Sequence, residues 1–293
     1  MQKQSFWKTA LRRTPVVRGY DEYSAKITEP VKIALVTDLH STRYGGRQIR
    51  LLHAIRRYRP DLILMAGDIA DETVSLEGTR QFLAGVGECL AKDGDGGANL
   101  GAHPGPNDSP RCFFVTGNHE QRIGNLPALK KMFASHGVAV LSGETRTVDV
   151  GGQLLDIGGV DDPTVFTRSR FVRQIPALWE RQLAVCRSGI SPERYSILLS
   201  HRPELARYYR CCGFDLVTAG HAHGGQVRIP GLINGLLAPH QGVFPRYAGG
   251  RYRLGATTMI ISRGLCLNRL PRIFNPPELV VIRLLPALPA SLH

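Results

Sequence analysis

The sequence contains no apolar run that approaches the ~20 residues needed to cross a bilayer. Its basic N-terminus also lacks the apolar stretch of a signal peptide, so a cytoplasmic location is expected. The six cysteines include no Cys-x-x-Cys pair, which argues against a zinc finger or a disulfide framework. Of the 293 residues, 43% are hydrophobic and 21% are charged, which is typical of a globular protein with a substantial core.

Positive charge is the main compositional bias, with a formal net charge of +13. It favours anionic partners, which include phosphate esters, nucleic acid and an anionic membrane surface, although it also fits a charge that only keeps the protein soluble. No recognised nucleic-acid-binding module appears, but nucleic acid stays open as a partner. Trp7 and Leu11 could anchor the chain peripherally at the inner membrane face, although a frayed basic tail is the preferred interpretation.

The apolar pattern predicts an α/β fold. Short, continuous apolar runs alternate with stretches of helical spacing, an arrangement typical of a sheet that is covered on both faces. The expected strands are residues 33–37, 62–66, 112–116, 146–150, 153–158, 195–200, 216–219, 252–254, 257–262 and 279–285. The expected helices are residues 47–58, 76–90 and 177–185. Gly151-Gly152 between two strands indicates a hairpin.

Composition also suggests the domain boundaries. Residues 1–30 are interpreted as a basic N-terminal extension, 31–286 as a single domain and 287–293 as a tail. A segment at about 92–111 is rich in Gly, Asp, Asn and Pro and has almost no core-forming residues. We interpret it as a flexible surface insertion in that domain.

Polar residues follow five of the predicted strands at the point where each strand ends. These residues are Asp38 and His40, Asp68, Asn118 and His119, His201, and His221 and His223. In open α/β sheets, ligands bind in the crevice at the carboxyl ends of the strands. These side chains are therefore expected to converge on one site.

The side chains at these strand ends suit a pair of metal ions. Apart from His119, they comprise two carboxylates, one amide and four imidazoles, which are too many for one ion and enough for two. Oxygen and nitrogen donors without thiolate favour Mn, Fe or Zn over calcium. A single Asp at a strand end is more often a helix cap, and a single His more often a structural residue. Their joint occurrence favours the metal interpretation, since five of the ten histidines fall in these positions.

The same segments form five ordered motifs that resemble the calcineurin-like metallophosphoesterase superfamily. The motifs are Asp38-Leu-His40, Gly67-Asp68-Ile-Ala-Asp71, Gly117-Asn118-His119-Glu120, Ser200-His201 and Gly220-His221-Ala-His223. The stretches from Gly220 to Pro230, Ser262 to Gly264 and Phe274 to Val281 are similar to a bacterial branch that includes cell-wall-associated phosphoesterases and UDP-2,3-diacylglucosamine pyrophosphatases. The resemblance implies an α+β four-layer sandwich, in which two mixed β-sheets pack together with helices on the outer faces.

The resemblance also implies a role for each motif residue. Asp38, His40 and His223 would hold the first metal, while Asn118, His201 and His221 would hold the second. Asp68 would bridge the two. His119 would act on the phosphate as a general acid or charge stabiliser, and Asp71 would orient it. Cys266 departs from the family pattern, where a small residue is expected, which puts the shape of that loop in doubt.

Several further residues are candidates for supporting the site. Arg43, Arg47 and Arg50 follow the first motif, and arginine matches phosphate bidentately, although a solvated helix face is equally consistent. Arg228, Arg246, Phe244 and Tyr247 lie near motif-bearing loops. Glu120, Asp161 and Asp162 could hold the metal-binding imidazoles in place, and a plain turn is the preferred interpretation for the Asp161-Asp162 step.

The predicted function is metal-dependent hydrolysis of a small or lipid-linked phosphate ester. A phosphodiesterase or pyrophosphatase reaction is preferred, with a metal-bridging hydroxide attacking phosphorus. A phosphomonoesterase or nuclease with the same site is an alternative, and so is a binding scaffold without catalysis.

Overall fold

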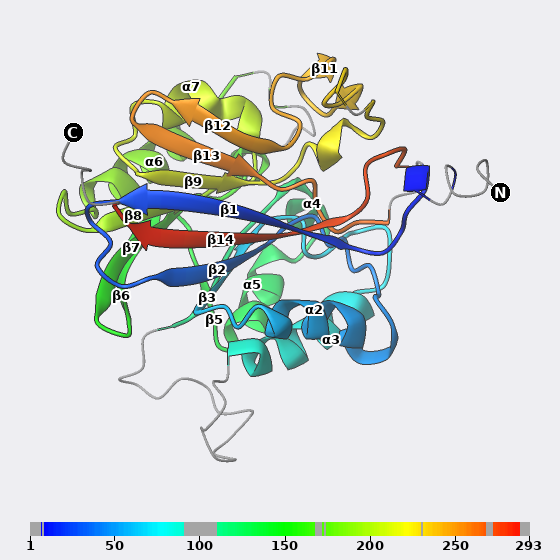
Figure 1. The fold of residues 1–293 in the computed structure, drawn as a ribbon, viewed down its shortest axis with the longest axis horizontal. Coiled ribbons are helices and arrows are strands. Elements are labelled where there is room, and N and C mark those ends of the chain that lie inside the picture. Colours follow the sequence, from blue (N-terminus) through cyan, green and yellow to red (C-terminus); the bar gives the residue numbers. More distant parts are fainter. Residues whose placement is uncertain are drawn as a thin grey trace, which may run out of the picture.

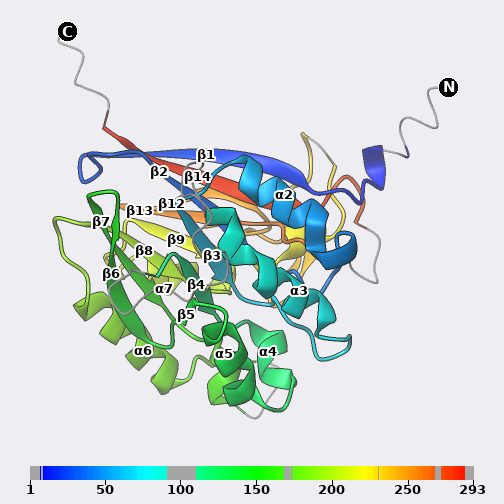
Figure 2. The same cartoon turned by 90° about the horizontal axis from the view of Figure 1, so that it is seen from below.

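Two six-stranded sheets lie face to face, with helices on both outer faces (Figures 1 and 2). The computed structural model describes residues 7, 9–90, 110–167, 172, 174–229, 231–267 and 272–287. The predicted α+β four-layer sandwich is confirmed. Nearly all of the predicted insertion at about 92–111, and nearly all of the predicted tail, lie outside the described residues.

Each sheet is mixed. The first has the order β1-β14-β2-β3-β4-β5, in which β2 to β5 run parallel and β14 is antiparallel to β2. Its strands are β1 (Val16–Ser24), β14 (Glu278–Pro286), β2 (Val31–Val36), β3 (Leu62–Ala66), β4 (Cys112–Val115) and β5 (Val138–Val140). In the second sheet the four inner strands run parallel and both edge strands are antiparallel. Its order is β12 (Gly250–Leu254), β13 (Thr257–Ile261), β9 (Leu216–Ala219), β8 (Tyr195–Leu199), β7 (Gln153–Gly159) and β6 (Glu144–Val150).

The inner strands are buried on both faces, which explains their continuous apolar sequences. In β3, Leu62 and Leu64 pack between the two sheets, whereas Ile63 and Met65 pack under the helices. Successive side chains of a strand point to opposite faces, so every position of β3 is in a core. This double burial holds the carboxyl ends of the inner strands in fixed positions.

The helices cover the two outer faces separately. The first sheet is covered by α2 (Ile49–Arg57), α3 (Glu77–Val86) and α5 (Leu126–Ala134), and the second by α6 (Ala177–Ser188) and α7 (Ala206–Tyr209). The short helix α4 (Asn118–Arg122) follows β4 directly. Short 3-10 turns lie at Gly46–Gln48, Gly87–Leu90, Pro163–Phe166, Pro203–Leu205 and His223–Gly225. No helix in the described ranges is both long and apolar enough to cross a bilayer.

The first sheet begins earlier in the chain than the predicted boundary at residue 31. Val16–Ser24 forms the edge strand β1, which pairs in parallel with β14 along its whole length. Only one of its residues is fully buried, and its partner lies more than 250 residues later, so neither a continuous apolar run nor a nearby hairpin marks it in the sequence. A second hairpin, β10 (Leu237–Ala238) and β11 (Gly242–Val243), lies outside both sheets.

Candidate metal centre

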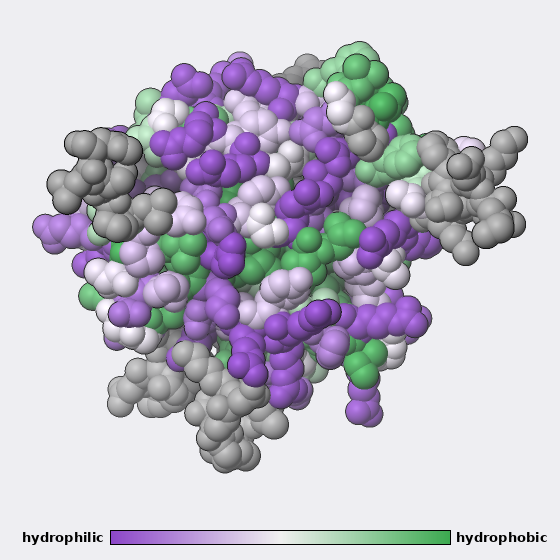
Figure 3. All heavy atoms as spheres, in the orientation of Figure 1, coloured by the Kyte–Doolittle hydropathy of each residue, from purple (hydrophilic) through white to green (hydrophobic). Residues whose placement is uncertain are grey.

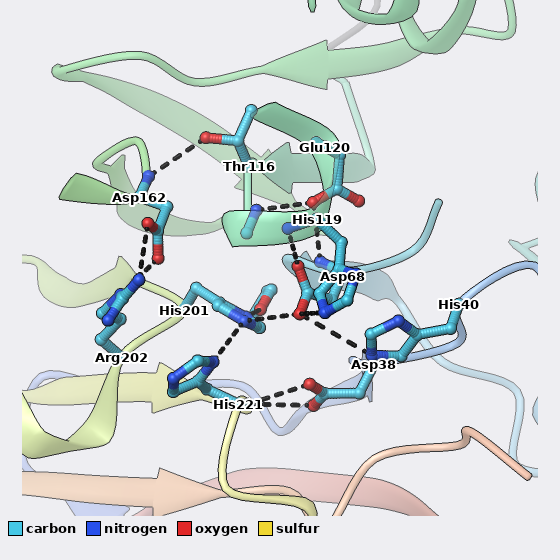
Figure 4. Close-up of polar contacts among 12 residues, drawn as sticks. Asp38, His40, Asp68, Thr116, His119, Glu120, Asp162, His201, Arg202 and His221 are labelled. Carbon is cyan, nitrogen blue, oxygen red and sulfur yellow. Dashed lines mark hydrogen bonds and ion pairs between the residues drawn. The ribbon is translucent and has the colours of Figure 1, made fainter. Parts of the chain in front are cut away.

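Six of the seven predicted ligands lie together at the carboxyl ends of strands from both sheets. Figure 4 shows five of these six. The seventh, Asn118, stands between Gly117 and His119, which both contact Asp68. Asp38, Asp68 and Asn118 follow the parallel strands β2, β3 and β4 of the first sheet. His201 and His221 follow β8 and β9 of the second. Because the two sheets face each other, residues from the strand ends of both sheets meet in one buried site.

The side chains of Asp38, His40 and His223 form the first group. Asp38 Oδ1 lies 3.6 Å from His223 Nε2, and the His40 and His223 ring centroids are 5.1 Å apart. One ligand atom from each of the three residues falls within 4.8 Å of the others. This spacing allows all three atoms to approach a single cation.

Asp68, His201 and His221 form the second group. Asp68 Oδ2 is 3.0 Å from His201 Nε2, which is 3.1 Å from His221 Nδ1. The same carboxylate oxygen is 3.7 Å from His40 Nε2 in the first group. Asp68 therefore stands between the two groups, where one side chain can serve both.

Besides Asp68 Oδ2, two buried atoms of the predicted ligands have no hydrogen-bond partner among the described residues. They are Asn118 Oδ1 and His40 Nε2. A buried polar atom without a partner costs free energy, and such atoms in a native protein call for an explanation, such as an ion. Both carry an electron pair that a divalent cation would accept. The residues present therefore fit a metal site with nitrogen and oxygen donors.

The imidazoles are held in place through their second nitrogen. His201 Nδ1 lies 2.8 Å from the carbonyl oxygen of Ala66, and His40 Nδ1 lies 2.8 Å from Asp71 Oδ2. Partners of this kind fix the tautomer and the orientation of a ligating ring. In both residues Nε2 is therefore the atom presented to the site.

Burial and charge adjust the protonation of the site. Burial and the charge of Arg202 lower the pKa of His221 well below its usual range. Burial and the charge of His40 do the same for His223. Both shifts favour the neutral imidazole, which is the form that metals bind. Burial alone would raise the pKa of Asp68, but His201 and His119 hold it well below its usual range. Burial would lower the pKa of His201, but Asp68 raises it to about 10, so a cation has to displace a proton there.

The backbone at the site is strained. The φ angles of Asp38, His40, Asp68, His221 and His223 lie between +47° and +65°, in the left-handed region. A residue other than glycine costs roughly 1–3 kcal/mol there, and such strain persists only where surrounding contacts enforce it. Backbone strain of this kind clusters at functional sites. Its presence at five of the seven predicted ligands supports a functional role for the cluster.

Two glycines allow the loops to approach each other. A Cβ on Gly117 would lie 2.2 Å from Asp68 Oδ1, and a Cβ on Gly264 would lie 2.5 Å from Asp38 Cβ. Arg272, which the sequence reasoning missed, holds the loop of Gly264 by donating to the carbonyl oxygens of Gly264 and Cys266 at 3.1 and 3.0 Å. Cys266 is buried in this loop.

Glu120 joins the loops that carry Asp68 and Asn118. Its fully buried carboxylate accepts hydrogen bonds from the backbone N–H groups of four residues, at 2.7–3.0 Å. These residues are Asp68, Ile69, Ala70 and Gly117. Burial, followed by the charge of Asp68, raises the pKa of Glu120 to about 7. Glu120 was predicted to hold imidazoles, but in the structure it fixes the backbone on which the ligands are mounted.

His119 lies beside the site with its ring partly exposed. Its Nε2 is 4.0 Å from Asp68 Oδ2, and its Nδ1 lies 2.7 Å from Glu72 Oε2. The predicted partner Asp71 is farther from this nitrogen, at 3.5 Å, and hydrogen bonds to His40 instead. Glu72, which sequence reasoning missed, is therefore the closer partner of His119, and Arg122 stands 3.5 Å from Glu72.

Asp161 and Asp162 hydrogen bond to residues other than the imidazoles they were predicted to hold. Asp161 accepts from Thr116 Oγ1 and Lys130 Nζ, both at 2.8 Å. Asp162 receives two hydrogen bonds from Arg202, at 2.6 and 3.1 Å, and caps the following turn through Thr164. The Asp162–Arg202 pair is almost fully buried, and it anchors the segment that follows His201 (Figure 4).

Replacing Arg202 with methionine is expected to destabilise the fold by about 3–5 kcal/mol, because it leaves Asp162 buried without its cation. The measurement is urea unfolding in the presence of a chelator, so that metal binding does not contribute. Arg146→Met is the matched control, since the Arg146–Glu144 pair is about half exposed, and its cost is expected to stay below about 1 kcal/mol. Equal losses in the two variants would contradict this assignment.

The arginines that were predicted to bind phosphate do not contact the cluster of predicted ligands. Arg43, Arg47 and Arg50 are all exposed, and within the described residues no hydrogen bond or ion pair joins them to the cluster. Arg246 lies over the ring of Tyr247, and Arg228 donates to Asn234. Phosphate binding by Arg43 and Arg47 therefore stays a prediction.

Comparison with known proteins gives one family. The profile of the calcineurin-like phosphoesterase family matches residues 31–225. The chain is 28% identical over 257 residues to the uncharacterised metallophosphoesterase YkuE of Bacillus subtilis, covering 86% of this chain and 78% of that protein. It is 24% identical over 264 residues to the phosphodiesterase YaeI of Escherichia coli K12, covering 87% and 82%.

Another relative is longer than this chain. The uncharacterised metallophosphoesterase Cj0846 of Campylobacter jejuni is 26% identical over 276 residues, which are 93% of this chain. The chain spans only 64% of the length of that relative. The family profile nevertheless extends over well more than half of the chain and includes all seven predicted ligands. The prediction from the motifs is confirmed, and the chain belongs to the calcineurin-like phosphoesterase family.

Proposed function

We propose that this protein hydrolyses phosphodiesters or pyrophosphates with the help of two divalent cations. The observation that carries the proposal is the position of Asp68, whose Oδ2 lies 3.0 Å from His201 Nε2 and 3.7 Å from His40 Nε2. One carboxylate thus adjoins two groups of donors, as a pair of neighbouring ions requires. The family implies divalent metal ions, and a relative carries the name phosphodiesterase.

Each donor group has a defined part in this proposal. Asp38, His40 and His223 would hold one cation. His201, His221 and the unpartnered oxygen of Asn118 would hold the other, and Asp68 would touch both. When bound, divalent cations acidify water and draw negative charge from phosphoryl oxygens. Their identity is proposed to be Mn, Fe or Zn, because the donors are nitrogen and oxygen without sulfur.

His119 is proposed to act on the substrate. Its ring is more exposed than the predicted ligands, and its Nε2 faces the cluster at 4.0 Å from Asp68 Oδ2. Since Glu72 lies against the other ring nitrogen, the imidazole is held with Nε2 towards the reacting group. From this position it can donate a proton to the leaving oxygen or stabilise charge on the phosphoryl group.

Hydrolysis of bis-p-nitrophenyl phosphate and p-nitrophenyl phosphate, measured after chelation and after adding Mn²⁺, Fe²⁺ or Zn²⁺, tests the proposal. We expect no turnover of the chelated protein, recovery with at least one cation, and at least about tenfold preference for the diester in kcat/KM. A preference for the monoester would favour a phosphomonoesterase. Absence of hydrolysis with all three cations, in protein that binds them, would favour a scaffold without catalysis.

A further inference from the structure

An unusual number of large apolar side chains is exposed on the segment that contains β10 and β11. They are Ile229, Leu232, Leu236, Leu237, Val243 and Phe244, and we call them the apolar patch. Leu232 is 78% exposed and Phe244 is 65% exposed. Figure 3 shows a green area where Figure 1 labels β11. Single exposed leucines are normal on a protein surface, whereas a contiguous group marks an interaction site.

Backbone hydrogen bonds hold the apolar patch in its shape. Ile233 and Ile229 close a turn at 2.8 Å, and Phe244 N–H donates to the Leu236 carbonyl at the same distance. Leu236 N–H also donates to the carbonyl of Gly225, two residues after His223, at 2.9 Å. The patch is therefore a built part of the fold, and its exposure does not come from a loose chain.

The N-terminal segment lies beside the same region. The Ala10 carbonyl accepts from Phe274 N–H at 2.7 Å, and the Ile273 carbonyl accepts from Arg228 N–H at 3.0 Å. Trp7 and Leu11, which flank this contact, are 57% and 45% exposed. These two residues add exposed apolar side chains close to the apolar patch. Tryptophan in particular favours membrane–water interfaces.

The segment that carries the apolar patch has positive charge and no negative charge. Residues 226–250 contain two arginines, Arg228 and Arg246, and no acidic residue, whereas the later Arg263 and Arg272 are buried and Arg251 pairs with Glu22. Before Asp21 the sequence has no acidic residue and five lysines and arginines. Exposed apolar side chains next to exposed cations such as Arg12, Arg13 and Arg246 match an anionic lipid surface, which accepts the apolar groups and attracts the cations.

We propose that the apolar patch, together with Trp7 and Leu11, docks on an anionic lipid bilayer. The patch adjoins the candidate metal centre, because His240, between β10 and β11, lies with its Nδ1 3.1 Å from His221 Nε2. Docking would bring the centre close to the headgroups. The docking goes beyond the proposed hydrolysis and does not depend on it.

Cosedimentation of the full chain with vesicles tests this proposal. Vesicles of phosphatidylglycerol and phosphatidylcholine are compared with vesicles of phosphatidylcholine alone, at low and high salt. Leu232→Ser/Phe244→Ser is expected to bind the anionic vesicles on the order of 100-fold more weakly than the unchanged chain. Leu178→Ser/Val185→Ser is the matched control, since these α6 side chains are also about half exposed and lie outside the patch. It is expected to bind like the unchanged chain.

Three results would overturn the docking proposal. The first is equal binding to both kinds of vesicle, or to neither. The second is unchanged vesicle binding by the patch variant. The third is self-association of the unchanged chain that the patch variant abolishes, without vesicle binding, because the patch would then join copies of the chain. Hydrolysis of bis-p-nitrophenyl phosphate, measured without vesicles, reports separately on the proposed function and shows that the variants are folded.

Discussion

Replacing Asp68 with alanine is expected to remove both metal binding and hydrolysis. The Asp68 carboxylate lies against donors of both groups, at 3.0 Å from His201 Nε2 and 3.7 Å from His40 Nε2. Its loss would also remove a buried negative charge that offsets the charge of a cation at this place. We expect metal content to fall from about two ions per chain to less than one, and kcat/KM to fall by roughly 10³-fold or more.

Metal analysis of the purified protein and turnover of the diester measure this effect. Asp149→Ala is a matched control, because Asp149 is an exposed aspartate near the end of β6, away from the strand ends that carry the cluster. It is expected to keep both its metal and its rate. A metal content in Asp68→Ala equal to that of the unchanged chain would show that Asp68 does not bridge.

His119→Ala is expected to retain its metal ions and to lose about 10²–10⁴-fold in kcat. The reason is its position, because Glu72 lies 2.7 Å from His119 Nδ1 and His119 Nε2 faces the site at 4.0 Å from Asp68 Oδ2. The residue can thus serve the substrate without serving a cation. Metal analysis and steady-state kinetics of the same preparation separate the two roles.

The leaving group provides the sharper test of His119. Proton donation matters most for a poor leaving group, so the loss in His119→Ala is expected to be larger for an alkyl ester than for a p-nitrophenyl ester. His53→Ala is the control, because His53 is an exposed histidine on α2. An equal loss for both esters would assign His119 to charge stabilisation alone, and a loss of metal would assign it to the metal site.

The sequence predicted that these side chains meet because parallel strands impose a simple geometry. Asp38, Asp68 and Asn118 each follow an inner strand of the first sheet, and the carboxyl ends of parallel strands meet at one edge. The position of each polar residue directly after an apolar run therefore predicts that these residues lie together at one edge of the sheet. The hairpin at Gly151-Gly152 was also predicted and lies between β6 and β7 as expected.

Other features depend on contacts that a linear pattern does not encode. Asp71 and Glu72 are adjacent carboxylates on a turn, and the local backbone decides which of them reaches His119 and which reaches His40. Strand β1 is defined by pairing with β14 at the far end of the chain. Arg272 lies in an irregular loop, and its role is visible only from the carbonyl oxygens that surround it.

We propose above that the cluster holds two neighbouring cations that share Asp68. Anomalous diffraction from crystals grown with Mn²⁺ locates such cations directly. We predict two anomalous peaks, one among Asp38, His40 and His223 and the other among Asn118, His201 and His221, with the Asp68 carboxylate touching both. A single peak, or peaks away from these side chains, would contradict the account.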